Sequence, residues 1–319
     1  MRRTIAVRLC AAVLAAASAF AQENDIGPPP GRLVDVGGRS LHVLCSGTGS
    51  PTVILEAGAS AFAIDWSLVQ PEIARRNRVC SYDRAGSGWS QQRGEVDTPA
   101  RIVRDLHAAL AAAGEKPPYV LVGASMGGVY VRLYQLEYPP EVAGLVFVDP
   151  STEDGLFTMY QGKGVEIASL TAEQLRTTMP SGPVQVPRRQ AQTGAPFDRL
   201  PRQLCEIRVK LEQRLIDSIP PTVPADVVRD VNEGNRAALA RLRQSRTMPE
   251  APIARVPVVV LTRGDGPAQN HAALAKLSVR GRHIIVAGAA HEIHLSDPAA
   301  VVQAINDVID ATARPADAR

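Results

Sequence analysis

Short aliphatic runs that alternate with helical patterns constrain the fold of this chain more than any other feature. Six runs, from residue 52 onward, are unbroken or nearly so, as expected for parallel strands covered on both faces. Between them, residues 99–114 carry apolar side chains at helical spacing, and residues 127–138 form a second helical pattern. This alternation predicts an α/β fold with a mostly parallel sheet. The eight candidate strands are RLVDVGG, SLHVLCSG, TVILEAG, RVCSYD, YVLVGA, GLVFVD, VPVVVLTRG and RHIIVAG.

Residues 151–250 interrupt the alternation. Prolines are frequent there, and two helical patterns, 201–219 and 225–244, appear with no convincing strand between them. Apolar residues at helical spacing favour packed helices over the alternative, a disordered linker; they are Leu204, Ile207, Leu211 and Leu215. We therefore expect a core of residues 22–150 and 251–319, with residues 151–250 inserted as a helical cap over the carboxyl edge of the sheet.

Residues 1–21 are typical of a cleaved secretory signal. Arginines precede an alanine-rich apolar run, and Ala19-Phe20-Ala21 provides an A-x-A cleavage site. The alternative is a membrane anchor, but the run from Leu9 to Phe20 is shorter than the roughly 20 residues of a span. We expect a periplasmic or secreted protein with no membrane span after cleavage.

The charge balance of the chain gives no indication of a polyanionic partner. The chain has 35 Lys and Arg against 32 Asp and Glu, and removal of residues 1–21 takes away three arginines and no acid. The mature chain is then neutral, so electrostatics give no reason to expect nucleic acid or an anionic membrane as a partner.

Ser125 lies in the motif Gly123-x-Ser125-x-Gly127, between a predicted strand and a predicted helix. A serine on such a turn needs small neighbours, because the backbone bends sharply and the helix packs close to the strand. The helix N-terminus also favours developing negative charge. Ser125 is therefore a candidate nucleophile, and the alternative is a serine that only shapes the turn.

A serine nucleophile needs a base, and the chain has six histidines. His291 follows the last candidate strand, so it should reach the carboxyl edge of the sheet where Ser125 lies. His294 is the competitor, three residues on. A zinc site at these two histidines lacks the H-E-x-x-H spacing and a third ligand, so we expect no metal or cofactor. The other histidines lie in strand or helix patterns: His42, His107, His271 and His283.

The acid and the oxyanion donors complete the predicted site. Asp265 follows the next-to-last strand pattern and is the preferred acid. Asp149, in LVFVDP at the end of the strand before the insertion, stays open, and Asp154 ranks third. The backbone N–H groups of Met126 and Ala59 are the predicted donors to an oxyanion.

With these motifs in chain order, the sequence resembles the α/β-hydrolase fold superfamily, in its branch of esterase-like serine hydrolases with a helical cap. The resemblance runs from about residue 33 to 310. It implies an eight-stranded, mostly parallel sheet of order 1-2-4-3-5-6-7-8, a cap after the sixth strand, and supporting roles for Asp83 and Arg84. The matching pieces are ILEAGAS, Trp66, YDRAGSGWS, VLVGASMGG, LVFVDP, VPVVVLTRGD and GAAHEIHLSDP.

The chain departs from the superfamily pattern twice. Ala57-Gly58 replaces the usual His-Gly of the oxyanion turn, and Asp265 follows Gly264 directly where the family has Gly-x-x-Asp. The second departure keeps Asp149 open as the acid, because some members place the acid after the sixth strand.

Cys45 and Cys80 both lie in candidate strands and are the candidate disulfide pair, with two buried thiols as the alternative. The resemblance places the second strand beside the fourth, as a parallel pair, which would bring these cysteines together. Cys205 lies in the predicted cap.

The resulting hypothesis is a secreted serine hydrolase that cleaves carboxylic esters through Ser125, His291 and Asp265. Peptidase, lactonase and thioesterase activities use the same residues and stay open. Ser125 argues against the activities of superfamily members that use an aspartate nucleophile, the epoxide hydrolases and haloalkane dehalogenases. The alternative of another class is a non-catalytic binding protein on the same scaffold.

Overall fold

A computed structural model describes residues 26–94, 96–161, 163–179, 181–248 and 250–313. Residues Gly31–Arg319 form the unit that holds the whole sheet. The predicted signal segment, residues 1–21, lies outside the described residues. Among the described residues, no helix combines the length and apolar character that crossing a membrane requires.

An eight-stranded sheet organises this unit, as predicted. The spatial order is β1-β2-β4-β3-β5-β6-β11-β12, which is the expected 1-2-4-3-5-6-7-8 with β11 and β12 as the last two strands. Strand β2 pairs antiparallel with both neighbours, and all other pairs are parallel. The strands are β1 (Arg32–Asp35), β2 (Ser40–Ser46), β3 (Thr52–Glu56), β4 (Val79–Tyr82), β5 (Tyr119–Ala124), β6 (Val142–Val148), β11 (Val258–Arg263) and β12 (Gly281–Val286).

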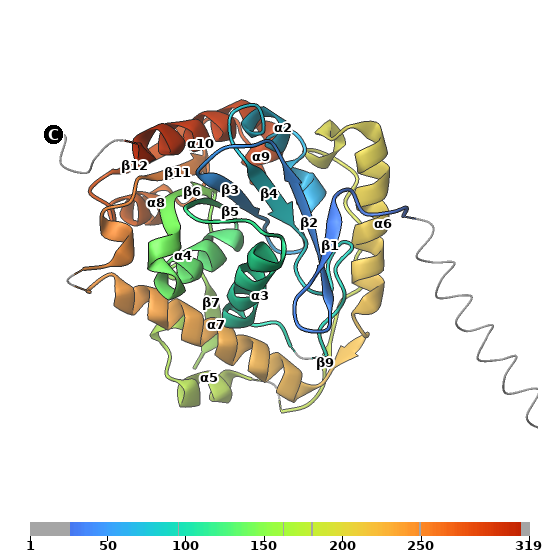
Figure 1. Ribbon diagram of the computed structural model, residues 1–319. Helices are drawn as coiled ribbons and strands as arrows, with labels where there is room; N and C mark the ends of the chain where they lie inside the picture. The colour runs from blue at the N-terminus through green and yellow to red at the C-terminus, as the bar shows by residue number, and fades with distance from the viewer. Residues whose placement is uncertain (1–25, 95, 162, 180, 249, 314–319) are drawn as a thin grey trace, which may run out of the picture. The chain divides into compact units, whose positions relative to one another are not determined.

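Helices cover both faces of the sheet (Figure 1). Both faces of strand β5 are buried, which explains its run of apolar residues. Leu121 packs in the cluster that includes α3 and α4, while Val120 and Val122 pack in the cluster that includes α2 and α10. Alternate side chains therefore enter two separate cores. The helices around the sheet are η1 (Ala63–Trp66), α2 (Gln70–Ile73), α3 (Pro99–Ala112), α4 (Gly127–Glu137), η2 (Pro139–Glu141), α8 (Ala268–Ala275), α9 (Ile293–Ser296) and α10 (Pro298–Thr312).

The chain between β6 and β11 holds the predicted long helices, but it is not purely helical. The expectation of no strand between the two long helices is wrong, because the short strand β10 lies there and pairs with β9. A second strand pair, β7 with β8, precedes both helices. Its elements are β7 (Phe157–Tyr160), β8 (Lys163–Glu166), η3 (Ile167–Ser169), α5 (Ala172–Thr178), β9 (Val184–Gln185), η4 (Phe197–Arg199), α6 (Arg202–Ser218), β10 (Thr222–Val223), α7 (Ala225–Ser245) and η5 (Pro252–Ala254).

The buried face of α6 also differs from the predicted one. Leu204, Ile207 and Leu215 are only half-buried. The residues that α6 buries are Arg208, Leu211, Glu212 and Ile216. Leu211 is thus buried as predicted. Two charged residues share its face because Arg208 and Glu212, one turn apart, form an ion pair.

A disulfide joins Cys45 to Cys80, as expected. The two cysteines are register partners on β2 and β4, with Cα atoms 4.1 Å apart. The expected parallel pairing of these strands is wrong: they run antiparallel, which sets the two residues directly opposite each other.

We predict that Cys45→Ala/Cys80→Ala lowers the free energy of unfolding by about 3–4 kcal/mol, because the bridge closes a loop of 35 residues and restricts the unfolded chain. Urea unfolding under non-reducing conditions measures the loss. Cys205→Ala, which removes the free half-buried cysteine, is the control and should cost much less. A double variant as stable as this control would contradict the prediction.

Candidate active site

Ser125 occupies a strained turn between β5 and α4. Its φ is +50°, in the left-handed region that a serine rarely adopts. The backbone around it is tied down: its N–H donates to Val148 O at 3.1 Å, and its carbonyl accepts from Gly128 N at 2.9 Å and Ser151 N at 2.8 Å. Ser125 therefore lies where the sequence predicts, at the end of β5.

Glycines make this turn possible through close backbone approach. A Cβ added at Gly127 would lie 2.5 Å from Glu56 O, and one at Gly123 would lie 2.5 Å from Gly127 O. At Gly58 the added atom would meet Ser125 Cβ at 3.2 Å. The small residues of the motif thus allow α4 and the loop after β3 to press against Ser125.

Arg84 braces the loop that follows β3. Its Nη1 donates to Glu56 Oε1 at 2.6 Å and to Ala57 O at 2.8 Å, and its Nη2 donates to Gly58 O. Burial raises the pKa of Glu56, and the charge of Arg84 and a hydrogen bond from Tyr82 oppose that rise. This buried ion pair fixes the loop opposite Ser125.

Asp83 is a second support. It accepts hydrogen bonds from Ala63 N at 2.8 Å and Trp89 N at 3.1 Å, and its Oδ2 lies 2.7 Å from His42 Nδ1. These contacts tie the loop after β4 to η1 and β2. Both Asp83 and Arg84 thus make contacts that support neighbouring loops, as the superfamily resemblance implies.

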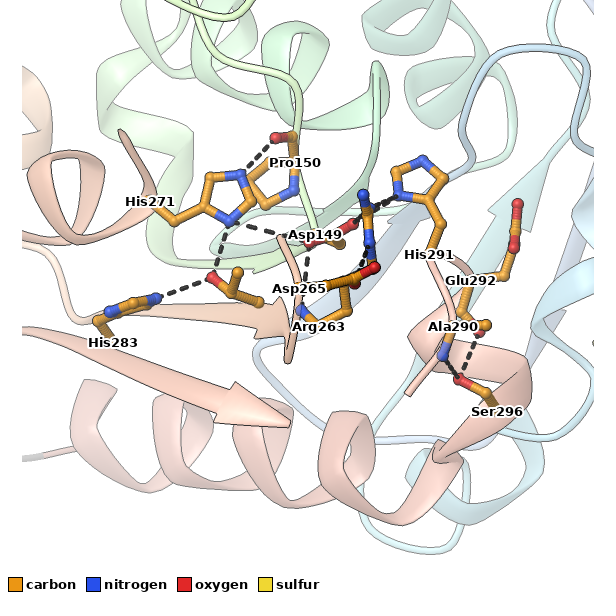
Figure 2. Close-up of polar contacts among 11 residues, drawn as sticks. Asp149, Pro150, Arg263, Asp265, His271, His283, Ala290, His291, Glu292 and Ser296 are labelled. Atoms are coloured by element: carbon orange, nitrogen blue, oxygen red, sulfur yellow. Dashed lines mark hydrogen bonds and ion pairs between the residues drawn. The ribbon is translucent and has the colours of Figure 1, made fainter. Parts of the chain in front are cut away.

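His291 pairs with Asp149 (Figure 2). Its Nδ1 lies 2.6 Å from Asp149 Oδ2, so the imidazole donates a hydrogen bond to this carboxylate, which directly follows β6. The preference for Asp265 as the partner of the imidazole is wrong. The side chain of Asp265 is 86% exposed and accepts instead from Arg263 Nε at 2.9 Å. Asp149, the alternative acid, takes the position.

Asp149 is turned toward the imidazole by its backbone and by a neighbouring cation. Its φ is +43°, and its N–H continues the parallel ladder by donating to Leu261 O at 2.9 Å. Arg263 Nη1 donates to the same oxygen, Oδ2, that accepts from His291, and Arg263 N donates to Oδ1 at 3.2 Å. The carboxylate thus accepts hydrogen bonds at both oxygens.

Opposite pKa shifts follow from this contact. Burial alone would raise the pKa of Asp149, but hydrogen bonds from His291 and Arg263 and the Arg263 charge outweigh it and lower the pKa. The hydrogen bond to Asp149 raises the pKa of His291 above its ordinary value, against desolvation. The pair therefore favours a charged imidazolium next to an ionised carboxylate.

A pocket of about 200 Å³ brings Ser125 and His291 together. Residues from α6 and the segment before it close one side of it. The lining residues are Gly58, Ala59, Ser60, Ala61, Asp65, Ala124, Ser125, Arg189, Gln192, Phe197, Arg208, Glu212, His291, Glu292 and His294.

The competitor histidine, His294, has a different environment. It is 4% exposed, and its ring packs against that of Trp66, with the ring centres 4.5 Å apart and the planes tilted by 33°. Burial lowers its pKa to about 3, and the neighbouring charges of His291 and Arg208 add to that effect. His294 therefore stays neutral, and its contacts differ from those of a histidine held by a carboxylate.

The pocket wall contains buried charges that sequence reasoning missed. Arg208 on α6 is 2% exposed; its Nε donates to Asp65 at 3.0 Å, its Nη1 to Glu212 at 2.8 Å, and its guanidinium lies 3.6 Å from the centre of the Phe197 ring. Burial raises the pKa of Asp65 to about 6, against the charge of Arg208. This ion pair attaches α6 to η1 beside the pocket.

The predicted oxyanion donors come from two segments next to Ser125. Ala59 lines the pocket next to Gly58, and Met126 directly precedes α4. Their place in the loop after β3 and at the start of α4 is the expected one. Their role stays a prediction.

The family follows from a comparison of the sequence with known families. The model of the alpha/beta hydrolase family matches residues 43–304. The chain belongs to this family.

The chain is also similar to curated proteins and to solved structures. An uncharacterized protein of Bacillus subtilis strain 168, YbdG, is 26% identical over 47% of this chain and 46% of its own length. The chain thus spans less than half the length of this relative. Two solved hydrolases share the fold: a thermophilic esterase from Thermogutta terrifontis (TM-score 0.59, 20% identity, 88% of this chain and 98% of that one) and an enol-lactonase from Burkholderia xenovorans LB400 (0.60, 17%, 88% and 100%).

For this alpha/beta hydrolase, we predict that Gly127→Ala destabilises the fold by about 1–3 kcal/mol, because the added Cβ must displace backbone atoms of Glu56 and Ala57. Thermal and urea unfolding measure the change. Gly164→Ala is the matched control, since its Cβ would meet nothing within 4 Å. Equal stability of the two variants would show that the turn is less tightly packed than described.

Proposed function

We propose that this chain is a serine hydrolase of carboxylic esters, in which Ser125 is the nucleophile, His291 the base and Asp149 the acid. The observation that carries the proposal is that Ser125 and His291 line one pocket while His291 Nδ1 is held 2.6 Å from Asp149. With Nδ1 bonded to the carboxylate, the other ring nitrogen, Nε2, is left to exchange a proton with the serine.

The reaction then follows from these roles. His291 Nε2 takes the hydroxyl proton as Ser125 Oγ attacks the ester carbonyl, and Asp149 stabilises the imidazolium that forms. The N–H groups of Ala59 and Met126 and the N-terminus of α4 stabilise the oxyanion. His291 returns the proton to the departing alcohol. A water molecule, deprotonated by His291, then attacks the acyl-enzyme. As the bond from the acyl carbon to Ser125 Oγ breaks, His291 returns the proton to Oγ and the carboxylic acid is released.

The pocket supports a small and polar substrate. Its volume is about 200 Å³, below the range usual for drug-sized ligands, and charged side chains of Asp65, Arg208 and Glu212 line its wall. We therefore expect short acyl chains to be turned over faster than long ones. The inserted segment acts as a cap, since α6 contributes to this wall.

Export from the cytoplasm is part of the proposal. The Cys45–Cys80 disulfide supports it, because such bridges persist in oxidising compartments. The signal-like composition of residues 1–21 gives the second reason.

We predict that Ser125→Ala reduces kcat for p-nitrophenyl acetate by roughly 10³-fold or more, because the nucleophile is lost while binding contacts remain. Ser151→Ala, next to the same turn, is the control and should keep most activity. A folded Ser125→Ala protein with near-native turnover would remove the mechanism. A wild-type protein inactive across an ester chain-length panel would favour a binding protein, and one active only on lactones, thioesters or peptides would change the substrate class.

We predict that Asp149→Asn lowers kcat/KM by roughly 10³–10⁴-fold, since an amide favours the wrong imidazole tautomer. Asp265→Asn is the matched control. Because Asp265 is exposed and its ion pair is with Arg263, not with His291, we expect a loss below about fivefold. Initial rates on one ester, with circular dichroism of each variant, decide the assignment. A severe loss in Asp265→Asn with a mild one in Asp149→Asn would reverse it.

A further inference from the structure

Arg263, the last residue of β11, shares a carboxylate oxygen with His291. Its Nη1 donates to Asp149 Oδ2, the same atom that lies 2.6 Å from His291 Nδ1. Figure 2 shows the guanidinium and the imidazole converging on this carboxylate. The two donor nitrogens, Arg263 Nη1 and His291 Nδ1, are 3.1 Å apart.

This contact places a permanent positive charge beside the ring that becomes positive during catalysis. When Nδ1 carries its proton toward Asp149, both nitrogens are donors, so neither satisfies the other. A like charge at this distance disfavours the protonated imidazole. The charge of Arg263 accordingly lowers the pKa of His291, against the larger raising effect of Asp149.

The other oxygen of Asp149 faces a neutral histidine. His271 Nε2 lies 2.8 Å from Pro150 O, which only accepts, so Nε2 carries the proton. His271 Nδ1 therefore accepts from Thr262 Oγ1 at 2.7 Å, and it lies 3.9 Å from Asp149 Oδ1. Burial lowers the pKa of His271, so this neighbour stays uncharged. Arg263 is therefore the permanently charged cation that contacts Asp149.

Asp265 holds Arg263 from the solvent side. The Asp265 carboxylate accepts a hydrogen bond from Arg263 Nε at 2.9 Å. On the other side, Arg263 donates to Asp149: its Nη1 to Oδ2 and its backbone N–H to Oδ1. The sequence Arg263-Gly264-Asp265, in which the aspartate follows the glycine directly, thus orients the arginine rather than the imidazole.

We propose that Arg263 is a positioning residue of the reaction: it fixes the Asp149 carboxylate and opposes positive charge on His291. The proposal rests on His291 acting as the base. It implies that the enzyme keeps its neutral base at lower pH than the Asp149 contact alone would allow, and that Asp149 keeps one orientation through the catalytic cycle.

Replacing Arg263 leaves the other ionisable groups near His291 in the protein, so a change in the pKa of His291 reports the effect of Arg263. Those that act on or face the imidazole and its acid come from the loop after β6, the end of β11, α8, the loop after β12 and α9. They are Asp149, Asp265, His271, Glu292 and His294.

The test is the pKa of His291 measured by NMR titration of protein labelled with ¹⁵N-histidine, in wild type and Arg263→Gln. The signal is assigned by its loss in His291→Gln. We expect the pKa to rise by about half a unit to one unit in Arg263→Gln, a shift reduced by the partial exposure of both side chains. An unchanged or lower pKa would overturn the proposal.

Kinetics provide the second readout. In Arg263→Gln the acid limb of kcat/KM should move to higher pH by the same amount, and kcat on the plateau should fall about three- to tenfold with KM nearly unchanged. Arg263→Met, which keeps much of the stem, should shift the pKa in the same direction, and Arg263→Lys, which keeps the charge, should shift it less. Arg282→Gln removes an exposed arginine paired with Asp307 and is the matched control, with no shift.

The two readouts separate this proposal from the proposed function. If the protein hydrolyses no ester, the NMR shift still reports whether Arg263 acts on His291. If Ser125→Ala abolishes turnover but Arg263→Gln and Arg263→Met leave both the His291 pKa and the pH profile unchanged, the hydrolase assignment stands and the role of Arg263 falls.

Discussion

The left-handed bend at Ser125 is the constraint on which the rest of the site depends. A serine at φ +50° is costly, and it persists because β5, α4 and the loop after β3 enclose it. Gly127 has no room for a side chain against Glu56 O, and Arg84 ties Glu56, Ala57 and Gly58 together. The bend thus holds the hydroxyl at the carboxyl edge of the sheet, beside the helix N-terminus.

The same edge collects the charged groups, because parallel strands all end there. Asp149 follows β6, Arg263 ends β11 and His291 follows β12. Because these three strands are neighbours in the sheet, the carboxylate, the guanidinium and the imidazole lie next to one another. The opposing effects of Asp149 and Arg263 on His291 then determine how strongly the ring holds its proton. On the far side of the pocket, the Arg208–Asp65 ion pair attaches α6 to the sheet domain.

Much of this arrangement is predictable from the sequence. Aliphatic runs of strand length indicate the eight strands and their family-like order, and small residues around Ser125 indicate the turn. The acid is not predictable from position, because Asp149 and Asp265 follow adjacent strands that end at one edge. Their roles depend on the backbone of Asp149 and on Arg263, which takes Asp265 as its partner. Hydrophobic periodicity could not predict that Arg208 and Glu212 are buried, because charged residues are buried there only as an ion pair within the packed face of α6.

The site at which a fluorophosphonate forms a covalent adduct tests whether Ser125 is the nucleophile. The wild-type protein is treated with the probe at neutral pH, digested, and its peptides are mapped by mass spectrometry. We expect one phosphonylated peptide, modified at Ser125, with labelling strongly slowed in Asp149→Asn and nearly unaffected in Asp265→Asn. Modification at another residue, or an unlabelled Ser125 in a folded protein, would contradict it.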